Sequence, residues 1–144
     1  MGTSAGNGYL VTEAMTATPD KLRLMLIDGA IRFGQSARQH WQASRDEQAG
    51  EAIIRCQEIV TELICGLNPT EQPELVRKIR GVYMFVFRTL TAAHVEHSDG
   101  KLTQALKILE IERDTWREVC QRFVTPGPLG NAAELVHESF SLEA

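Results

Sequence analysis

Metal-ligating residues are few in this chain, and their spacing does not build a site. His94 and His97 lie three residues apart in a helical stretch, and Glu134-x-x-His137 is the one Glu-x-x-His motif. Helical bundles that hold paired metals use two such motifs and two further inward-facing carboxylates. We therefore expect no metal centre and no metal-dependent catalysis.

Patterns for nucleophilic catalysis and for phosphate binding are also missing. Cys56, Cys65 and Cys120 are odd in number and lack Cys-x-x-Cys spacing, so we expect three reduced thiols that pack as small apolar residues. The glycine-rich start of the chain precedes no predicted strand, which a dinucleotide-binding turn would require. We expect a protein that is not an enzyme and has no cofactor.

Charge and hydropathy exclude two classes of partner. The 144 residues include 15 Lys and Arg against 19 Asp and Glu, for a net charge of −4, which gives no reason to approach nucleic acid. The longest apolar run, residues 82–87, is far shorter than the ~20 residues that span a bilayer. Residues 1–8 have neither the charged start nor the apolar centre of a signal peptide. We predict a cytoplasmic protein without membrane insertion.

The elements that must position any site are four long amphipathic segments. Apolar residues recur with helical spacing, and Pro or Gly punctuates the connections. We predict helices over residues 19–43, 46–67, 73–98 and 101–124. No useful stretch alternates with period two, so we predict an all-α protein. Helices of this length joined by short links pack as an antiparallel four-helix bundle.

This reading divides the chain into three parts. Residues 1–17 form a leader, residues 18–124 the bundle, and residues 125–144 a tail that begins with Pro-Gly-Pro. The tail could hold a fifth, short helix over residues 131–140. A single bundle of this size can bury one hydrophobic core.

The first predicted helix has a well-defined start and two apolar faces. Thr18 can cap it, Pro19 suits its first position, and Asp20 suits the positive helix end. We expect one face to pack in the core: Leu22, Met25, Leu26, Gly29, Phe33 and Ala37. The opposite face then carries surplus apolar residues that need a cover: Leu24, Ile27 and Ile31.

Three stretches of the sequence carry a resemblance to a known family. Residues 15–31 contain T-A-T-P-D-K-L-x-x-M-L-x-D-G-A-I, preceded by Tyr9. This stretch resembles the N-terminal signature of the FliS family, the bacterial flagellin export chaperones. Residues 52–67 and 109–116 match the family in order and spacing. Ile27 replaces the tyrosine that usually follows Met-Leu, so it keeps an apolar contact but loses a hydroxyl.

The resemblance implies a bundle that binds the C-terminal region of flagellin. In this family the flagellin segment is disordered when free and folds along apolar surface grooves, which prevents premature polymerisation and assists flagellar type III export. Components of the export apparatus are a second expected class of partner. The leader can lie over part of the binding surface, and here its apolar residues are Tyr9, Leu10 and Met15.

Apolar residues off the predicted core stripes are the expected partner-binding set. Amphipathic segments dock on such strips by helix-in-groove recognition. The set is Leu24, Ile27, Ile31, Tyr83, Phe87, Ile108, Ile111 and Val119.

Two further residues have an expected structural role. Arg113 falls on the core stripe of the fourth helix, where a cation needs a partner. We expect its stem to pack and its head to reach a carboxylate, with Asp28, Glu58 and Glu62 as candidates.

One other function and one assembly question stay open at this point. The same bundle could serve as an interaction or regulatory adaptor that does not bind flagellin. Exposed apolar strips could also pair two copies, so both a monomer and a weak homodimer are compatible with the sequence.

Overall fold

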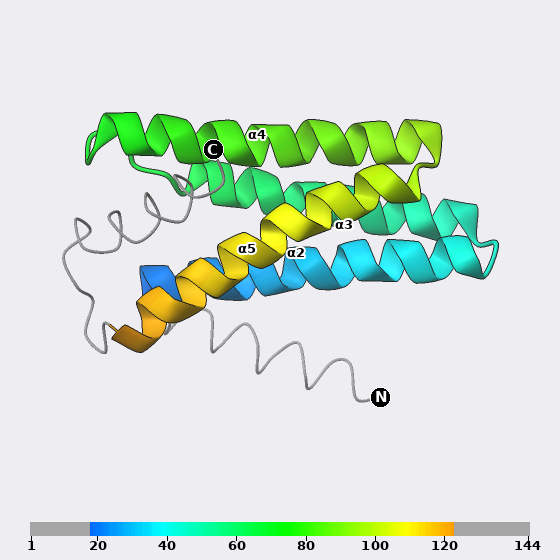
Figure 1. The fold of residues 1–144 in the computed structure, drawn as a ribbon, viewed down its shortest axis with the longest axis horizontal. Coiled ribbons are helices and arrows are strands. Elements are labelled where there is room, and N and C mark those ends of the chain that lie inside the picture. The colour runs from blue at the N-terminus through cyan, green and yellow to red at the C-terminus, as the bar shows by residue number, and fades with distance from the viewer. Residues whose placement is uncertain (1–17, 123–144) are drawn as a thin grey trace.

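A computed structural model of the protein describes residues 18–122, and this part of the chain is built from α-helices alone (Figure 1). The elements are α2 (Pro19–Gln42), α3 (Asp46–Cys65), α4 (Pro73–Glu96) and α5 (Asp99–Arg122). The predicted all-α four-helix bundle is therefore confirmed. The division into leader, bundle and tail stays a prediction, because residues 1–17 and 123–144 lie outside the described part.

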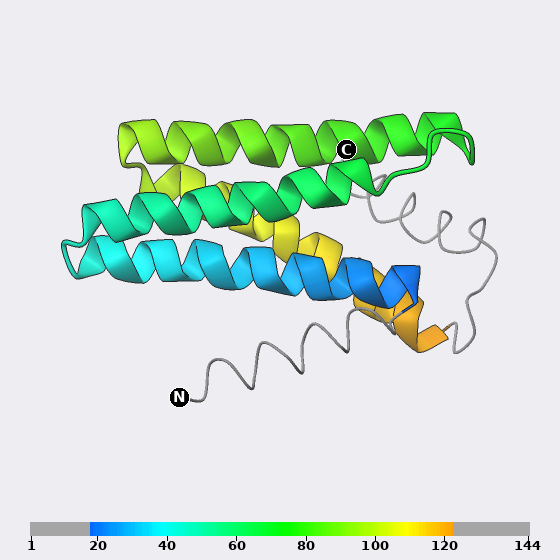
Figure 2. The same ribbon diagram turned by 180° about the vertical axis from the view of Figure 1, so that it is seen from behind.

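Consecutive helices run antiparallel and enclose one core. α3 lies between α2 and α4 when the bundle is seen from behind (Figure 2). α5 crosses the other side of these helices obliquely and contacts α2 and α4 (Figure 1). The first and last described helices are thus neighbours, and the start of α2 and the end of α5 lie at the same end of the bundle.

The predicted start of the first helix is confirmed. The Thr18 side-chain oxygen accepts the backbone N–H of Lys21 at 3.2 Å, and Pro19 is the first helical residue. Asp20 lies in the first turn, where its charge complements the helix dipole. Proline also opens α4, at Pro73.

The connection between α4 and α5 lies two residues earlier than predicted. His97 ends α4 in the left-handed conformation, with φ of 50°. The Ser98 hydroxyl then accepts the backbone N–H of Lys101 at 3.1 Å. Because this side-chain cap satisfies a free donor of the first turn, Asp99 and Gly100 are helical rather than part of the turn.

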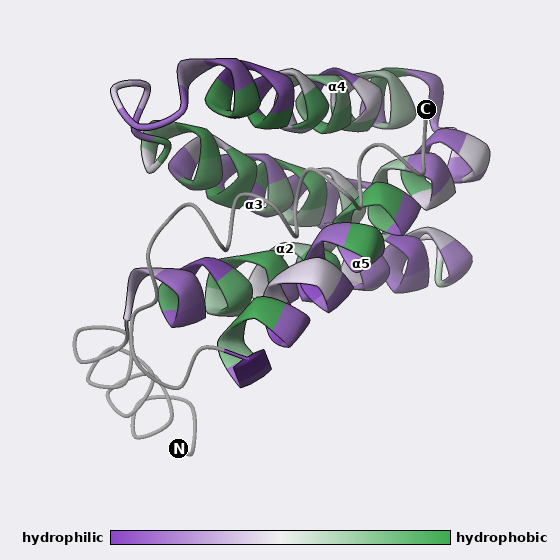
Figure 3. Cartoon of the chain, turned by 60° about the vertical axis from the view of Figure 1, so that its left-hand side comes forward, coloured by the Kyte–Doolittle hydropathy of each residue, from purple (hydrophilic) through white to green (hydrophobic). Residues whose placement is uncertain are grey.

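The core is formed by one contiguous set of apolar side chains. Hydrophobic and hydrophilic residues alternate along every helix, as amphipathic packing requires (Figure 3). The largest fully buried apolar side chains are Ile27, Ile53, Val60, Leu63, Tyr83, Val86, Leu90, Leu102, Leu109 and Val119. None of the described helices is long and apolar enough to cross a membrane.

Polar links tie neighbouring helices together. The Arg38 guanidinium pairs with Asp99 at 2.8 Å and joins α2 to α5. The Gln57 amide donates to the Phe87 carbonyl at 3.1 Å and to the Thr91 hydroxyl at 2.7 Å, which joins α3 to α4. These contacts set the relative position of helices whose apolar faces alone would allow sliding.

Alanine substitutions at two glycines should change the stability of the protein in opposite directions. A Cβ on Gly34 would collide with the Leu106 side chain, whereas a Cβ on Gly81 would meet no atom within 4 Å. We expect Gly81→Ala to stabilise the protein by about 0.5–1 kcal/mol, because Ala restricts the unfolded chain and favours a helix. Gly34→Ala should destabilise it by about 1–3 kcal/mol, because the buried Leu106 side chain must shift to make room for the methyl group. Urea unfolding of both variants tests this, and equal shifts of the same sign would contradict it.

Candidate partner-binding surface

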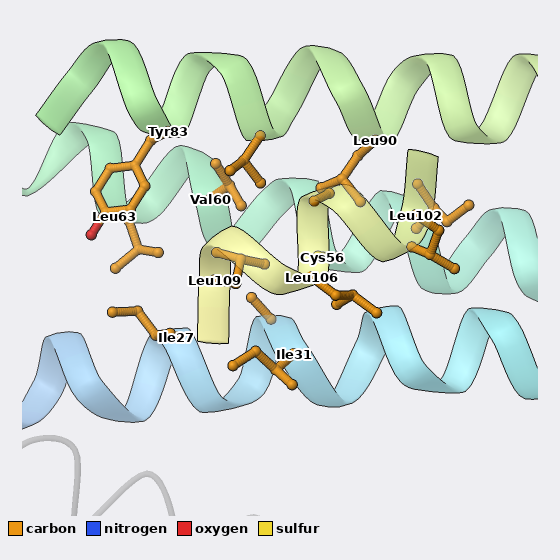
Figure 4. Close-up of a cluster of buried hydrophobic side chains, with 14 of the residues drawn as sticks. Ile27, Ile31, Cys56, Val60, Leu63, Tyr83, Leu90, Leu102, Leu106 and Leu109 are labelled. Carbon is orange, nitrogen blue, oxygen red and sulfur yellow. The ribbon is translucent and has the colours of Figure 1, made fainter. Parts of the chain in front are cut away.

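The predicted outer face of the first helix is wrong for two of its three residues. Ile27 is fully buried and Ile31 is 3% exposed. Both lie in the core cluster with Leu106 and Leu109 of α5 (Figure 4). The small residues on this side of α2 explain the burial, because Gly34 lets α5 approach the helix closely.

The other predicted contact residues divide into buried and half-buried groups. Tyr83 and Val119 are fully buried, so their assignment to a partner-binding surface is also wrong. The buried faces of α4 and α5 are therefore wider than the sequence pattern predicted. The half-buried residues are Leu24, Phe87, Ile108 and Ile111. Their role stays a prediction.

The apolar surface of α2 lies instead along its edge with α3. Leu22 is 36% exposed and Phe33 is 39% exposed, although both were expected in the core. Beside Leu22 and Leu26, α3 contributes Leu63 and Cys65 to a hollow of about 320 Å³. We call this hollow the α2–α3 groove; Phe33 is exposed farther along α2, outside the residues that line it. Of the predicted core face, Gly29 and Ala37 are buried as expected and Met25 and Leu26 are half-buried, so the prediction is wrong for Leu22 and Phe33.

A second hollow opens at the end of the bundle where α2 starts. It has a volume of about 200 Å³ and is lined by residues of α2, α4, α5 and the connection between α3 and α4, among them Arg23, Leu75 and Trp116. Pro19, the first residue of α2, lines both hollows. The start of α2 therefore lies at both hollows.

The floor of this end of the bundle is a buried polar cluster that the sequence did not predict. Glu112 has no exposed surface, and the Tyr83 hydroxyl donates to its Oε1 at 2.5 Å. Arg23 donates to the same hydroxyl at 3.5 Å, and its guanidinium lies 5.1 Å from the Trp116 ring centroid. Among the described residues, Glu112 Oε2 and Trp116 Nε1 are the buried side-chain atoms without a hydrogen-bond partner.

Burial is the largest influence on the pKa values of Glu112 and Tyr83. It raises the pKa of Glu112, while the hydrogen bond from Tyr83 and the charge of Arg23 act in the opposite direction. Burial, followed by the Glu112 charge, also raises the pKa of Tyr83. The cluster is a polar site in the interior of the bundle.

The sequence pattern placed a cation, Arg113, on the core face of α5, but the structure buries the carboxyl group of Glu112 there. Arg113 lies one residue after Glu112, keeps 27% of its side chain exposed, and pairs with Asp114 at 3.5 Å. The candidate partners Asp28, Glu58 and Glu62 do not form this contact, and Asp28 is half-buried. The predicted core position of the charged residue on α5 was therefore wrong by one residue. The sequence pattern gave no sign that Glu112, and not Arg113, would be buried.

The residues considered for metal or thiol chemistry do not converge in the described part of the chain. No three His, Cys, Asp or Glu side chains gather there as a metal site would require. His97 stacks on Trp41, with ring centroids 4.5 Å apart. Cys56 is buried, which raises its pKa to about 12, and Cys65 is exposed. Glu134 and His137 lie outside the described residues.

Comparison with known proteins decides the family. The family model described as Flagellar protein FliS matches residues 1–123. The chain belongs to the FliS family. A flagellar secretion chaperone FliS of Bacillus subtilis (strain 168) is 30% identical over 113 residues, which cover 78% of this chain and 84% of the relative. A FliS of Campylobacter jejuni subsp. jejuni serotype O:6 is 27% identical over 115 residues, or 80% of this chain and 90% of the relative.

The family assignment fits the geometry of this FliS chain. FliS proteins are flagellar secretion chaperones rather than a family of enzymes. The α2–α3 groove is an apolar hollow beside the hydrophobic core. The leader residues Tyr9, Leu10 and Met15 fall within the family match but outside the residues that the structure describes.

Proposed function

We propose that this protein binds the C-terminal region of flagellin in the cytoplasm, prevents its premature polymerisation and assists its export. The single observation that carries the proposal is the α2–α3 groove, where the exposed Leu22 lies with Leu26 and Leu63, while Phe33 is exposed farther along α2. Large apolar side chains that remain accessible along a groove are typical of a surface that receives an amphipathic helix.

The chemistry of the groove supports an apolar client. Its lining is mostly aliphatic, with Arg23 and Glu62 as charged groups near its ends. A segment that is disordered when free would fold as it lays its apolar residues along Leu22, Leu26 and Phe33. Such coupled folding buries apolar area, so binding should show a large negative heat-capacity change and weak salt dependence.

The proposal includes a role for the leader. Pro19 lines the groove, so the residues immediately before Thr18 start beside it. We propose that Tyr9, Leu10 and Met15 cover part of the groove and give way to flagellin. Such a cover competes with the client at high effective concentration.

A surface variant tests the site. Leu22→Glu together with Phe33→Glu should lower the affinity for a flagellin C-terminal fragment by at least about tenfold, since each change places a charge in an apolar contact worth about 1–3 kcal/mol. Circular dichroism should show an unchanged bundle, because both side chains are exposed. Titration calorimetry gives the affinity.

The matched control changes exposed apolar residues elsewhere. Ile54→Glu with Val95→Glu adds the same charge on α3 and α4, at positions that do not line the groove. We expect it to bind flagellin almost as the unmodified protein does. Equal losses in both variants would move the site away from the groove. No flagellin binding by the unmodified protein would instead favour the adaptor function.

A further inference from the structure

The outward side of α4 is an exposed surface of mixed apolar and basic character. Gly81, Met84 and Val95 lie on it at helical spacing, and Phe85 adjoins Met84. Met84, Phe85 and Val95 are among the most exposed large apolar residues of the described bundle. Because no atom lies within 4 Å of a Cβ built on Gly81, another segment can approach the helix backbone there.

Three cations surround this apolar strip. Arg77, Lys78 and Arg88 are all exposed on α4. The ion pairs formed among residues 18–122 use cations of α2, α3 and α5, and none uses a cation of α4. We call Arg77, Lys78, Gly81, Met84, Phe85, Arg88 and Val95 the α4 outer face. None of its three cations forms an ion pair among the described residues.

The acidic excess of the protein lies outside the bundle. All 15 Lys and Arg residues fall within residues 18–122, which contain an equal number of Asp and Glu. The net charge of −4 therefore comes from the flanking segments. The segment that follows α5 carries Glu134, Glu138 and Glu143, without any Lys or Arg, interleaved with apolar residues such as Leu135 and Phe140.

We propose that residues 123–144 dock on the α4 outer face, with their carboxylates against Arg77, Lys78 and Arg88 and their apolar side chains against Met84 and Phe85. The chemistry matches on both counts, because an acidic segment with apolar residues meets a basic surface with an apolar centre. The α4 outer face is thus an intramolecular docking site, distinct from the α2–α3 groove on the far side of α3.

The available chain length allows this contact. Trp116, which lies six residues before the end of α5, lines the same hollow as Leu75 and Val76 of α4. The eight residues 123–130 can span up to about 26 Å before the acidic stretch begins. A second copy of the same face is a poor alternative occupant, because α4 would then bring like charges together.

The test uses the full chain without any client. Amide hydrogen exchange over residues 131–142 should be slower than in a free peptide of the same sequence by about fivefold or more. Arg77→Glu with Arg88→Glu should return that exchange to the free-peptide rate. Raising the salt from 0.15 to 1 M should weaken the protection, because the Debye length falls from about 8 Å to about 3 Å.

Two comparisons make the result specific. Arg32→Glu with Lys107→Glu changes the charge by the same amount at exposed positions of α2 and α5 and should leave the protection intact. Glu134→Arg with Glu138→Arg should restore protection when combined with Arg77→Glu and Arg88→Glu. The proposal is overturned if the unmodified segment exchanges at the free-peptide rate, or if the α4 and control variants behave alike. It is also overturned if the charge swap gives no rescue. None of these outcomes depends on flagellin binding.

Discussion

Ile27→Asp should unfold the bundle, whereas Leu22→Asp in the same helix should leave it folded. Ile27 has no exposed surface and packs in the central cluster (Figure 4). An unpaired carboxylate there costs several kcal/mol beyond the lost apolar burial. That cost is comparable with the whole stability of a small domain, about 5–15 kcal/mol. Circular dichroism during thermal unfolding distinguishes the two variants.

A conservative change sets the scale for this result. Ile27→Val removes one methylene and should cost only about 0.5–1.5 kcal/mol. A cooperative transition of Ile27→Asp near that of the unmodified protein would mean that this side of α2 faces solvent. The prediction that Ile27 lies on an outer face of the first helix would then be correct.

Glu112→Gln should change how stability depends on pH. Burial raises the pKa of Glu112 above its ordinary value of 4.5, despite the opposing effects of Tyr83 and Arg23. The folded state therefore holds this proton at pH values where the unfolded chain has lost it. The stabilisation is complete below pH 4.5 and is lost as the pH rises through the folded-state pKa, by up to about 1.4 kcal/mol per pH unit.

Gln keeps the shape of the side chain and an oxygen that can accept from Tyr83, but it does not titrate. The difference in unfolding free energy between the unmodified protein and Glu112→Gln should therefore shift in favour of the variant as the pH rises above 4.5. Urea unfolding at several pH values between 4.5 and 8 measures this difference. A difference that is constant with pH would show that Glu112 titrates alike in the folded and unfolded states.

The helices could be predicted because their signals are local. Thr18, Pro19 and Pro73 mark helix starts through backbone geometry and hydrogen bonding that involve only neighbouring residues. The apolar residues of α3 also recur with helical spacing, so its place in a helix could be predicted. Helix starts and apolar spacing depend only on residues within one or two helical turns of each other, so they can be read from the sequence.

The orientation of α2 could not be predicted because both of its faces are apolar. One face carries Leu22 and Phe33 and the opposite face carries Ile27 and Ile31, so hydropathy alone could not decide which face is buried. The observed packing instead uses Gly34 as the place where α5 approaches, against Leu106. A partner helix that lies more than 60 residues away in sequence decides the question, and periodicity within α2 contains no information about it.

The position of Glu112 escaped sequence reasoning for a related reason. A charged residue inside an apolar stripe is ordinarily assigned to the surface, and its burial depends on Tyr83 from α4 and Arg23 from α2. The same burial removes Tyr83 from the candidate partner-binding surface, because its hydroxyl donates to Glu112 inside the bundle.

The contact between α2 and α5 has a consequence for synthesis of the protein on the ribosome. α2 is made first, but its apolar side is covered by α5, the last of the described helices to emerge. Until residues 99–122 leave the exit tunnel, the nascent chain exposes Ile27 and Ile31 without their final cover. A member of a chaperone family therefore spends its own translation as an incomplete bundle, vulnerable to association through the very side chains that later form its core.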